Sequence, residues 1–307
     1  MKILVTGGTG FVGSALVKEL VLQKKQLICS VRKQSSELSE SIDQIIIEDL
    51  NVGTDWSKSL IGVDMVIHLA ARAHISKHNS LAKFRAINTD ACLNLAKQAA
   101  KSGVTRFVFI SSIKVNGEST RDGVPFRPDD TFIPVDDYGL SKYEAEQGLL
   151  AISQETGMEF VIIRPPLVYG PGVKANFALM MRWVNVGFPL PLGAVNNKRS
   201  FLALDNLVNF IIHCIDHPRA ANQVFLIADD EDLSTTDLLY KIANAANKHI
   251  YLVPIPVCLM KTVARLIGRK NIAERLFGSL QLDSSKARIL LNWVSVVSME
   301  QQLKKMI

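Results

Sequence analysis

TGGTGFVGS, residues 6–14, is the stretch that decides the fold. It follows a short apolar run at residues 2–6 and precedes an amphipathic stretch at residues 15–22. Strand, glycine turn and helix in this order are typical of a dinucleotide-binding unit, in which glycines allow a tight turn, close approach to a pyrophosphate and close helix packing. A plain glycine turn is the alternative. Because the free N–H groups of the helix N-terminus face the phosphates, the expected cofactor contacts are Gly7, Gly10, Phe11, Val12 and Gly13.

Apolar runs that are typical of buried strands alternate with helical patterns through the first half of the chain. The strand candidates are 26–31, 43–48, 63–70, 106–112 and 158–170, and the clearest helical patterns are 84–102 and 138–155. This alternation predicts an α/β fold, a doubly wound parallel Rossmann sheet. After residue 172 it loosens, which indicates a smaller, mainly helical substrate domain. The expected division is 1–170, rejoined by 202–228, for the dinucleotide-binding domain, and 171–201 with 229–307 for the substrate-binding domain.

Composition excludes several classes of protein. A hydrophobic share of 48% over 307 residues supports a large core and excludes a disordered chain. The net charge of +6 is scattered rather than gathered in a stripe, so no nucleic acid is expected and an anionic small molecule explains the bias. Four cysteines stand without CxxC spacing, and His68, His74 and His78 lack a further ligand at suitable spacing, so no metal site is expected.

Targeting and membrane signals are weak. The opening apolar run is too short for the core of a signal peptide, which favours a cytoplasmic protein. Residues 251–268 form the most apolar late stretch, but two prolines and the charges of Lys261 and Arg265 make it a poor spanning helix. The stretch is therefore expected to be an amphipathic core helix, with a role at the membrane surface as the alternative.

Further cofactor contacts are expected at three strand ends. The second strand ends at Arg32 instead of an acidic residue. A carboxylate would repel a 2′-phosphate, whereas a guanidinium binds one, so NADP is favoured over NAD. In the alternative, Arg32 stacks on adenine or faces water. Asp49 and Leu50 are candidate adenine-side contacts or ordinary turn residues, and Ala70 and Ala71 leave room beside the nicotinamide path.

A serine, a tyrosine and a lysine form the candidate catalytic group. The run RFVFISS ends in Ser111 and Ser112 at the carboxyl end of a strand, where open α/β sheets build their sites. In DDYGLSKYEAE, Tyr138 and Lys142 are four residues apart and share one helical face. A serine at a strand end and this pair on the next helix can frame one hydroxyl or carbonyl group.

Taken together, the motifs TGGTGFVG, SS followed by YGLSK, RPPLVYGPG (164–172) and RSFLALDNL (199–207) cover most of the chain. With them the sequence resembles the extended short-chain dehydrogenase/reductase family, in its group of nucleotide-sugar epimerases, dehydratases and reductases. The resemblance implies that Tyr138 is the acid/base, that Lys142 is its electrostatic partner and ribose ligand, and that Ser112, which precedes VNG, donates to the reacting oxygen.

The resemblance also raises an expectation about acidity. A phenol has a pKa of about 10, so its use as a base near pH 7 requires a depression worth about 4 kcal/mol. The Lys142 ammonium and a positive nicotinamide ring are expected to supply it.

Substrate contacts follow from the same resemblance. Asn176 and Arg199 correspond to family contacts to a nucleotide diphosphate, with a helix cap and a solvated charge as their alternatives. The family often has an aromatic residue at Asn116, so the wall of the sugar pocket is expected to differ. Ile113 and Lys114 stand where dehydratases carry an acidic pair, which argues against dehydration. No evident arginine precedes the ending DSSKARILLNW, where some epimerases hold the diphosphate.

The resemblance favours an enzyme that acts at C4 of a UDP-hexose or UDP-N-acetylhexosamine, most simply a 4-epimerase working through a 4-keto intermediate. The alternative is an NADPH-dependent 4-ketoreductase of a UDP-4-keto-6-deoxy amino sugar, which Arg32 and the late-segment departure favour. A non-catalytic dinucleotide sensor is the alternative of another class. A homodimer and a place in polysaccharide biosynthesis are implied by the resemblance alone.

Overall fold

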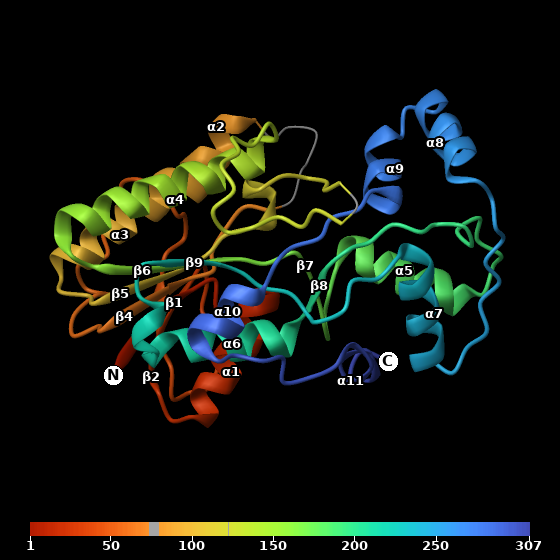
Figure 1. Ribbon diagram of the computed structural model, residues 1–307. Coiled ribbons are helices and arrows are strands. Elements are labelled where there is room, and N and C mark those ends of the chain that lie inside the picture. The colour runs from red at the N-terminus through yellow and green to blue at the C-terminus, as the bar shows by residue number, and fades with distance from the viewer. Residues whose placement is uncertain (74–79, 122) are drawn as a thin grey trace.

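The protein is built around a seven-stranded parallel sheet with helices on both faces (Figure 1). The computed structural model describes residues 1–73, 80–121 and 123–307. The strand order is β3-β2-β1-β4-β5-β6-β9, and each neighbouring pair is parallel. The strands are β1 (Lys2–Thr6), β2 (Gln26–Val31), β3 (Asp43–Ile46), β4 (Met65–His68), β5 (Arg106–Ile110), β6 (Glu159–Arg164) and β9 (Gln223–Leu226).

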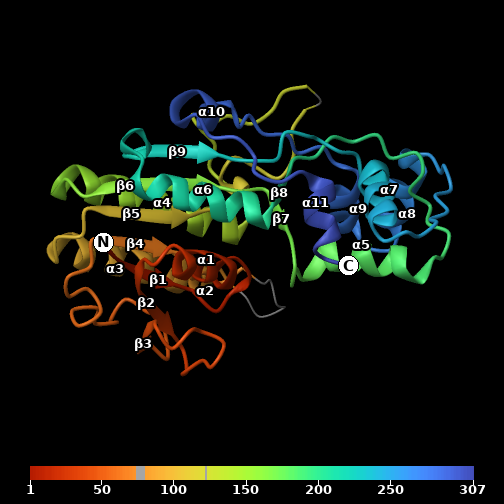
Figure 2. The same ribbon diagram turned by 90° about the horizontal axis from the view of Figure 1, so that it is seen from below.

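Two apolar cores hold the helices against the sheet. One core packs side chains of α1 (Phe11–Leu22), α6 (Leu204–Asp216) and α10 (Ser285–Leu291) against one face. The other packs α3 (Ala91–Lys101) and α4 (Asp137–Thr156) against the opposite face. Figure 2, seen from below, shows α1 and α6 in front of the strands. This is the predicted doubly wound Rossmann architecture, and its inner strands are apolar on both faces because both are covered.

The strand order reverses at β1, which pairs with β2 on one side and β4 on the other. In this register Thr6 lies opposite both Ser30 and His68. Open α/β sheets bind ligands outside the carboxyl ends of the strands at such a reversal. The fold therefore places the glycine turn after β1 at the point where a dinucleotide is bound.

A second, mainly helical region lies beyond the carboxyl ends of the strands (Figure 2). It contains the short parallel pair β7 (Leu167–Tyr169) and β8 (Phe201–Ala203). The stretch 158–170, predicted as one strand, forms two strands in different sheets, because Pro165 and Pro166 have no N–H group to continue a ladder. The helices of this region are α5 (Ala175–Val186), α7 (Thr235–Ala245), α8 (Val257–Leu266), α9 (Lys270–Phe277) and α11 (Met299–Lys304).

The α8 helix differs from its prediction as a core helix. None of its residues is buried, and only its inner face packs, partly, against the core of the second region. Among the described residues no helix is both long enough and apolar enough to cross a membrane. The boundaries predicted for the two domains stay a prediction, although β9 does pair with β6 in the main sheet.

A buried carboxylate fixes the second region to the sheet. Asp229 accepts hydrogen bonds from the Tyr169 hydroxyl (2.7 Å), the Asn206 amide (2.7 Å) and the Ala203 N–H (3.0 Å). These donors come from β7, from α6 and from the end of β8. Burial raises the pKa of Asp229, and the Asn206 and Tyr169 hydrogen bonds act against that increase.

We expect Asp229→Asn to lower the free energy of unfolding by about 1–3 kcal/mol, because the new amide N–H₂ would face a donor in a buried site. Asp230→Asn is the matched control. Asp230 pairs with Arg288 at the surface, and such a pair contributes about 1 kcal/mol or less. Urea unfolding of both variants measures the difference, and equal losses would contradict the role given to Asp229.

Candidate active site

The turn after β1 has no room for side chains at two of its glycines. Gly7 has φ +74°, and a Cβ atom there would lie 2.8 Å from the Ala70 nitrogen. A Cβ atom on Gly13 would lie 2.1 Å from the Gly7 carbonyl oxygen. The turn therefore depends on glycine for a positive φ at one position and for close packing at the other.

The start of α1 can hold a pyrophosphate. A Cβ atom on Gly10, the N-cap residue, would have only the Gly7 carbonyl within 4 Å, so the backbone is open to a ligand there. The first turn of α1 has no acidic residue and no side-chain cap. The first backbone hydrogen bond of the helix is the one that the Ser14 N–H donates to the Gly10 carbonyl. The N–H groups of Phe11, Val12 and Gly13 precede that bond and have no helical partner. These residues fit a dinucleotide.

A hydrogen-bonded link joins β1 to the end of β4. The Thr6 hydroxyl and His68 Nδ1 are 2.8 Å apart, and the Ala70 N–H donates to the same hydroxyl at 3.3 Å. Burial lowers the pKa of His68 to about 3, so the ring is neutral, and it belongs to the interior. His74 and His78 lie outside the described residues, within which no group of three or more His, Cys, Asp or Glu could hold a metal ion.

The other predicted cofactor residues lie along the same edge of the sheet. Arg32 is exposed directly after β2. Asp49 is exposed after β3, and the neighbouring Leu50 packs partly against the core. Ala70 is half-buried beside Gly7, and Ala71 is exposed.

The predicted catalytic serine faces the start of α4. Asp136 caps this helix by accepting from the Gly139 N–H at 3.1 Å, which places Tyr138 in the first turn. Ser112 begins the 3₁₀ turn η2 (Ile113–Val115), and its hydroxyl lies near the Tyr138 phenol, where it lowers the phenol's pKa. Ser111 instead donates to the Glu146 carboxylate and is buried.

The acidity of Tyr138 differs from the expectation. Burial, followed by the charge of Asp136, raises its pKa to about 12, and the Ser112 hydroxyl only partly opposes them. The expected depression is therefore not a property of the protein alone. The positive ring of an oxidised nicotinamide remains the expected source.

Lys142 is buried one helical turn beyond Tyr138. Its ammonium lies 4.0 Å from the centre of the Phe109 ring, a cation–π contact. Burial lowers its pKa to about 8, while the nearby Cys92 and Glu146 act in the opposite direction. The same ammonium contributes to lowering the pKa of His68, which places it close to the link between β1 and β4.

A buried ion pair ties α4 to β6 and to the loop after η2. Arg164 donates to both oxygens of Glu146 and also to the Asn116 side-chain oxygen at 2.9 Å. The Asn116 amide in turn donates to the Arg127 carbonyl at 2.8 Å. Asn116 is therefore buried in this network. The expectation that its side chain changes the wall of the sugar pocket stays a prediction.

Lys114 takes part in a second link to the catalytic helix. Its ammonium bonds Asp136, the cap of α4, at 2.9 Å and Glu118 at 2.7 Å. The residue thus joins the segment after Ser112 to the start of the helix that carries Tyr138.

Sequence reasoning missed Asn88, which lies in a single π-helical segment, η1 (Arg85–Asp90), between α2 (Leu81–Phe84) and α3. Its side chain accepts from the Arg72 N–H at 2.8 Å and donates to the Ser141 hydroxyl at 3.0 Å. The Ser141 hydroxyl donates to the Tyr138 carbonyl. The stretch had been predicted as one regular helix, and π segments of this kind are frequent at functional sites.

Two arginines come together in the second region. Arg199 is largely buried and donates to the Gly278 carbonyl at 2.9 Å. Burial and the nearby charge of Arg275 lower its pKa. Arg275 lies on α9, before the ending DSSKARILLNW. Whether it takes the place of the arginine that some epimerases carry there stays a prediction. Asn176 is exposed in the first turn of α5.

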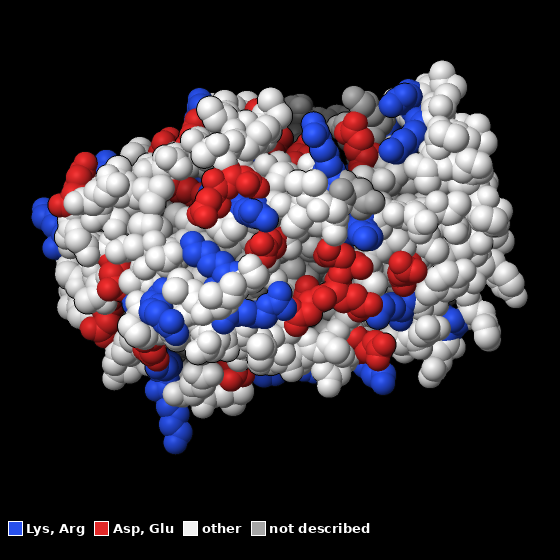
Figure 3. Space-filling view, in the orientation of Figure 1, with Lys and Arg blue, Asp and Glu red and all other residues white. Residues whose placement is uncertain are grey.

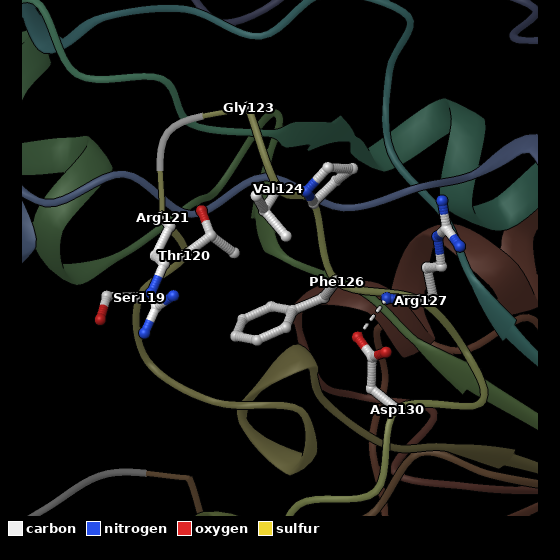
Figure 4. A pocket seen from close by; sticks show the side chains of 9 residues that line it. Ser119, Thr120, Arg121, Gly123, Val124, Phe126, Arg127 and Asp130 are labelled. Atoms are coloured by element: carbon white, nitrogen blue, oxygen red, sulfur yellow. Dashed lines mark hydrogen bonds between the residues drawn. The ribbon is translucent and has the colours of Figure 1, made fainter.

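A cavity of about 540 Å³ lies beside these elements (Figure 4). Its described wall consists of residues 119–121, 123–127 and 130, among which the Phe126 ring and the Arg121 side chain are prominent. The Thr120 N–H donates to the Ser279 carbonyl and the Phe126 N–H to the Gln281 carbonyl, both at 2.9 Å. The cavity wall is therefore joined to the chain that follows α9.

Comparison with known proteins agrees with this geometry. Residues 3–228 match the model of the NAD dependent epimerase/dehydratase family. A UDP-glucose 4-epimerase of Vibrio cholerae is 45% identical over 308 residues, covering 99% of this chain and 94% of the relative. The chain belongs to the NAD dependent epimerase/dehydratase family.

A more distant relative and a solved structure are also similar to this chain. An Escherichia coli O157:H7 protein named N-acetyl-alpha-D-glucosaminyl-diphospho-ditrans,octacis-undecaprenol 4-epimerase is 27% identical, covering 93% of this chain and 88% of the relative. The structure of UDP-glucuronic acid 4-epimerase from Bacillus cereus in complex with NAD has a TM-score of 0.80 at 22% identity, covering 100% of this chain and 97% of that chain. The latter likeness shows the shared fold.

Membership of this family confirms three predictions from the sequence: the Rossmann fold, the group of related enzymes, and a nicotinamide dinucleotide as the cofactor. The preference for NADP drawn from Arg32 stays a prediction, since the family is described as NAD dependent. The individual site residues are proposals, which the contacts described above support.

The buried ammonium of Lys142 should cost this family member stability. A lysine has a pKa of about 10.4 in an unfolded chain and about 8 here. Between pH values of about 8 and 10.4 the unfolded chain binds more protons at Lys142 than the folded chain does, so the free energy of unfolding rises with pH. The destabilisation that Lys142 causes at pH 7 therefore disappears as the pH rises. We expect Lys142→Met to raise the free energy of unfolding by about 3 kcal/mol at pH 7, with most of the difference gone near pH 10.

Urea unfolding without cofactor at both pH values measures this effect. Lys101→Met, at an exposed position on α3, is the matched control and should change little at either pH. A Lys142→Met variant less stable than the parent at pH 7 would show that the ammonium is well solvated or paired.

Proposed function

We propose that the protein is an NAD-dependent nucleotide-sugar 4-epimerase that acts on a UDP-hexose or UDP-N-acetylhexosamine through a 4-keto intermediate. The observation that carries the proposal is the 45% identity, over 99% of the chain, with a UDP-glucose 4-epimerase. The arrangement of Ser112, Tyr138 and Lys142 beside the dinucleotide turn supports it independently.

The contacts give each residue a role. Tyr138 is the acid/base, since its phenol lies at the start of a helix that Asp136 and Lys114 fix in place. Ser112 binds the same sugar oxygen as Tyr138, because its hydroxyl lies beside the phenol. Lys142 is the electrostatic partner and the ribose ligand, since its buried ammonium lies on the same helix one turn beyond Tyr138.

The reaction at C4 follows from these roles. When bound, NAD supplies a hydride acceptor that takes the C4 hydrogen with its electron pair and later returns it. Tyr138 removes the proton of the C4 hydroxyl as the C–H bond breaks, so a ketone forms. The 4-keto sugar turns over in the site and then receives the hydride on its opposite face. Return of the hydride would restore the oxidation state of C4. Tyr138 gives the proton back to the C4 oxygen, which regenerates the phenolate for the next turnover.

The cofactor site extends along the edge of the sheet. Gly7, Gly10 and Gly13 would let the pyrophosphate approach α1, and the N–H groups of Phe11 and Val12 would hold it. Adenine and its ribose would lie toward the exposed Arg32 and the turn at Asp49 and Leu50, and the nicotinamide would lie toward Ala70 and Ala71.

The substrate site lies between the two regions. Arg199 and Arg275 form a cationic pair that suits the diphosphate, because guanidinium groups bind phosphate oxygens in pairs of hydrogen bonds. Asn176, at the start of α5, is the further proposed contact.

The 4-ketoreductase is the second candidate, favoured by the exposed Arg32 alone. Its other support is the absence of an evident late arginine, and the position of Arg275 near Arg199 counts against that support. A non-catalytic sensor would not require the serine, tyrosine and lysine to be brought together. A homodimer, a cytoplasmic location and the two-domain division are further parts of the proposal, and the family resemblance supports them.

We expect the purified protein to invert C4 of UDP-glucose or UDP-N-acetylglucosamine without added reductant, because an epimerase regenerates its own cofactor. Product sugars are measured by NMR spectroscopy, and the dinucleotide released on denaturation is identified as NAD or NADP. A protein that turns over only a 4-keto substrate with added NADPH is the reductase. Tyr138→Phe should lower turnover by about 100-fold or more, whereas Tyr143→Phe on the next turn is the control.

We expect Arg275→Met to raise KM for the UDP-sugar roughly tenfold and to leave kcat within about twofold, because the diphosphate is bound equally in the ground and transition states. Arg265→Met, at an exposed position on α8, is the matched control. A loss of kcat without a change in KM would place Arg275 outside the diphosphate site.

A further inference from the structure

The α8 helix is attached to the protein along one face only. Val257 and Met260 on this inner face pack partly against the core of the second region, and no residue of the helix is buried. A helix of ten residues that forms in a folded protein normally hides an apolar stripe in its core. The stability of α8 therefore depends on an incomplete set of contacts.

The opposite face carries a second apolar stripe that no described residue covers. Leu259 is 56% exposed, Val263 48%, Leu266 82% and Ile267 66%. These positions are spaced i, i+4, i+7 and i+8, so they fall on one side of the helix and its final turn. Apolar residues scattered singly on a surface need no explanation, but a continuous row of four marks a contact site. We name these four side chains the α8 stripe.

The stretch of chain that contains the stripe is rich in positive charge. Residues 238–273 contain no Asp or Glu. Exposed Arg265 and Arg269 border the stripe on the same stretch of chain. In the space-filling view, the upper right of the molecule, where Figure 1 places α8, is mainly white with blue side chains at its inner border (Figure 3). The same 36-residue stretch carries the cations Lys241, Lys248, Lys261, Arg265, Arg269 and Lys270.

The combination of aliphatic side chains and bordering cations on α8 favours a membrane over a protein as the partner. A second copy placed symmetrically on α8 would bring Arg265 and Arg269 against their own copies, and like charges would repel. Protein interfaces are typically centred on aromatic anchors, whereas the α8 stripe is wholly aliphatic. A helix with aliphatic residues on its outer face and Lys or Arg at the border is suited to the headgroup boundary of an anionic bilayer.

We propose that α8 docks this protein onto the surface of anionic phospholipid membranes, with the α8 stripe inserted among the acyl chains and Arg265 and Arg269 on the headgroups. A helix of ten residues is about 15 Å long, which is too short to cross a bilayer but suits a position in the plane of the membrane–water interface. This inference does not rest on the proposed epimerase activity.

Docking would orient the active site. The α9 helix follows α8 directly and packs against it, and it carries Arg275, which lies close to Arg199. The chain after α9 bonds the wall of the 540 Å³ cavity through Ser279 and Thr120. A membrane held against α8 would therefore lie near the side of the protein on which the substrate enters.

Cys258 allows a direct test, because it is exposed on α8 while Cys29, Cys92 and Cys214 are buried. The full chain is labelled at Cys258 with an environment-sensitive fluorophore and mixed with vesicles of phosphatidylcholine alone or with phosphatidylglycerol added. We expect the fluorescence emission to shift to the blue, and the protein to float with the vesicles, only when the vesicles are anionic. Added salt should weaken both effects.

Two variants separate the apolar and electrostatic contributions. Leu266→Ser with Ile267→Ser should lower binding to anionic vesicles at least about tenfold. Arg265→Gln with Arg269→Gln should lower it by roughly 10- to 30-fold at low salt. The matched control is Leu22→Ser with Ile61→Ser, at equally exposed apolar positions on other elements. Circular dichroism and thermal unfolding establish that all variants fold as the parent does.

Three results would overturn the proposal. The parent protein could fail to bind anionic vesicles, or could bind neutral and anionic vesicles equally. The α8 variants could bind as tightly as the control. Light scattering could show that the parent is an oligomer without vesicles and that the Leu266→Ser, Ile267→Ser variant is smaller, which would assign the stripe to a second copy.

Discussion

The close approach of β1 and β4 at their carboxyl ends is the constraint on which the site depends. Gly7 lies so near Ala70 that a Cβ atom would collide with its backbone, and the hydrogen bond between Thr6 and His68 holds the two strands in this register. Both strands are covered on both faces, so a shift of either strand by one residue would move its side chains into the opposite core and disrupt the packing there. The glycine turn, the start of α1 and the expected nicotinamide path are positioned together as a result.

The catalytic helix is fixed to this sheet by polar contacts rather than by apolar packing alone. Glu146, paired with Arg164 and bonded by Ser111, holds the middle of α4. Lys114 holds its first turn through Asp136. A buried ion pair is costly to break because one charge would be left unpaired. These contacts limit the freedom of Tyr138 relative to Ser112, and catalysis at a single sugar oxygen needs such positioning.

Without a cofactor, the protein does not lower the pKa of the catalytic phenol. The Tyr138 phenol is held neutral and the Lys142 ammonium is buried against Phe109 at a cost to its charge. A bound dinucleotide would offer hydroxyl groups to the lysine and a positive ring to the phenol. The free energy that the protein stores in the burial of the Lys142 ammonium therefore favours binding of the cofactor before chemistry begins.

The sequence by itself determined the fold class, the glycine turn and the candidates Ser112, Tyr138 and Lys142, because these depend on local periodicity and on short spacings along one strand or helix. It also predicted the family. Only the tertiary structure brought Arg275 to Arg199, buried Asn116 in an ion-pair network and left α8 without a cover. Each of these depends on contacts between residues far apart in the chain, and local pattern carries no information about which distant elements meet. An amphipathic helix has the same pattern whether its apolar face meets a core, a partner or a membrane.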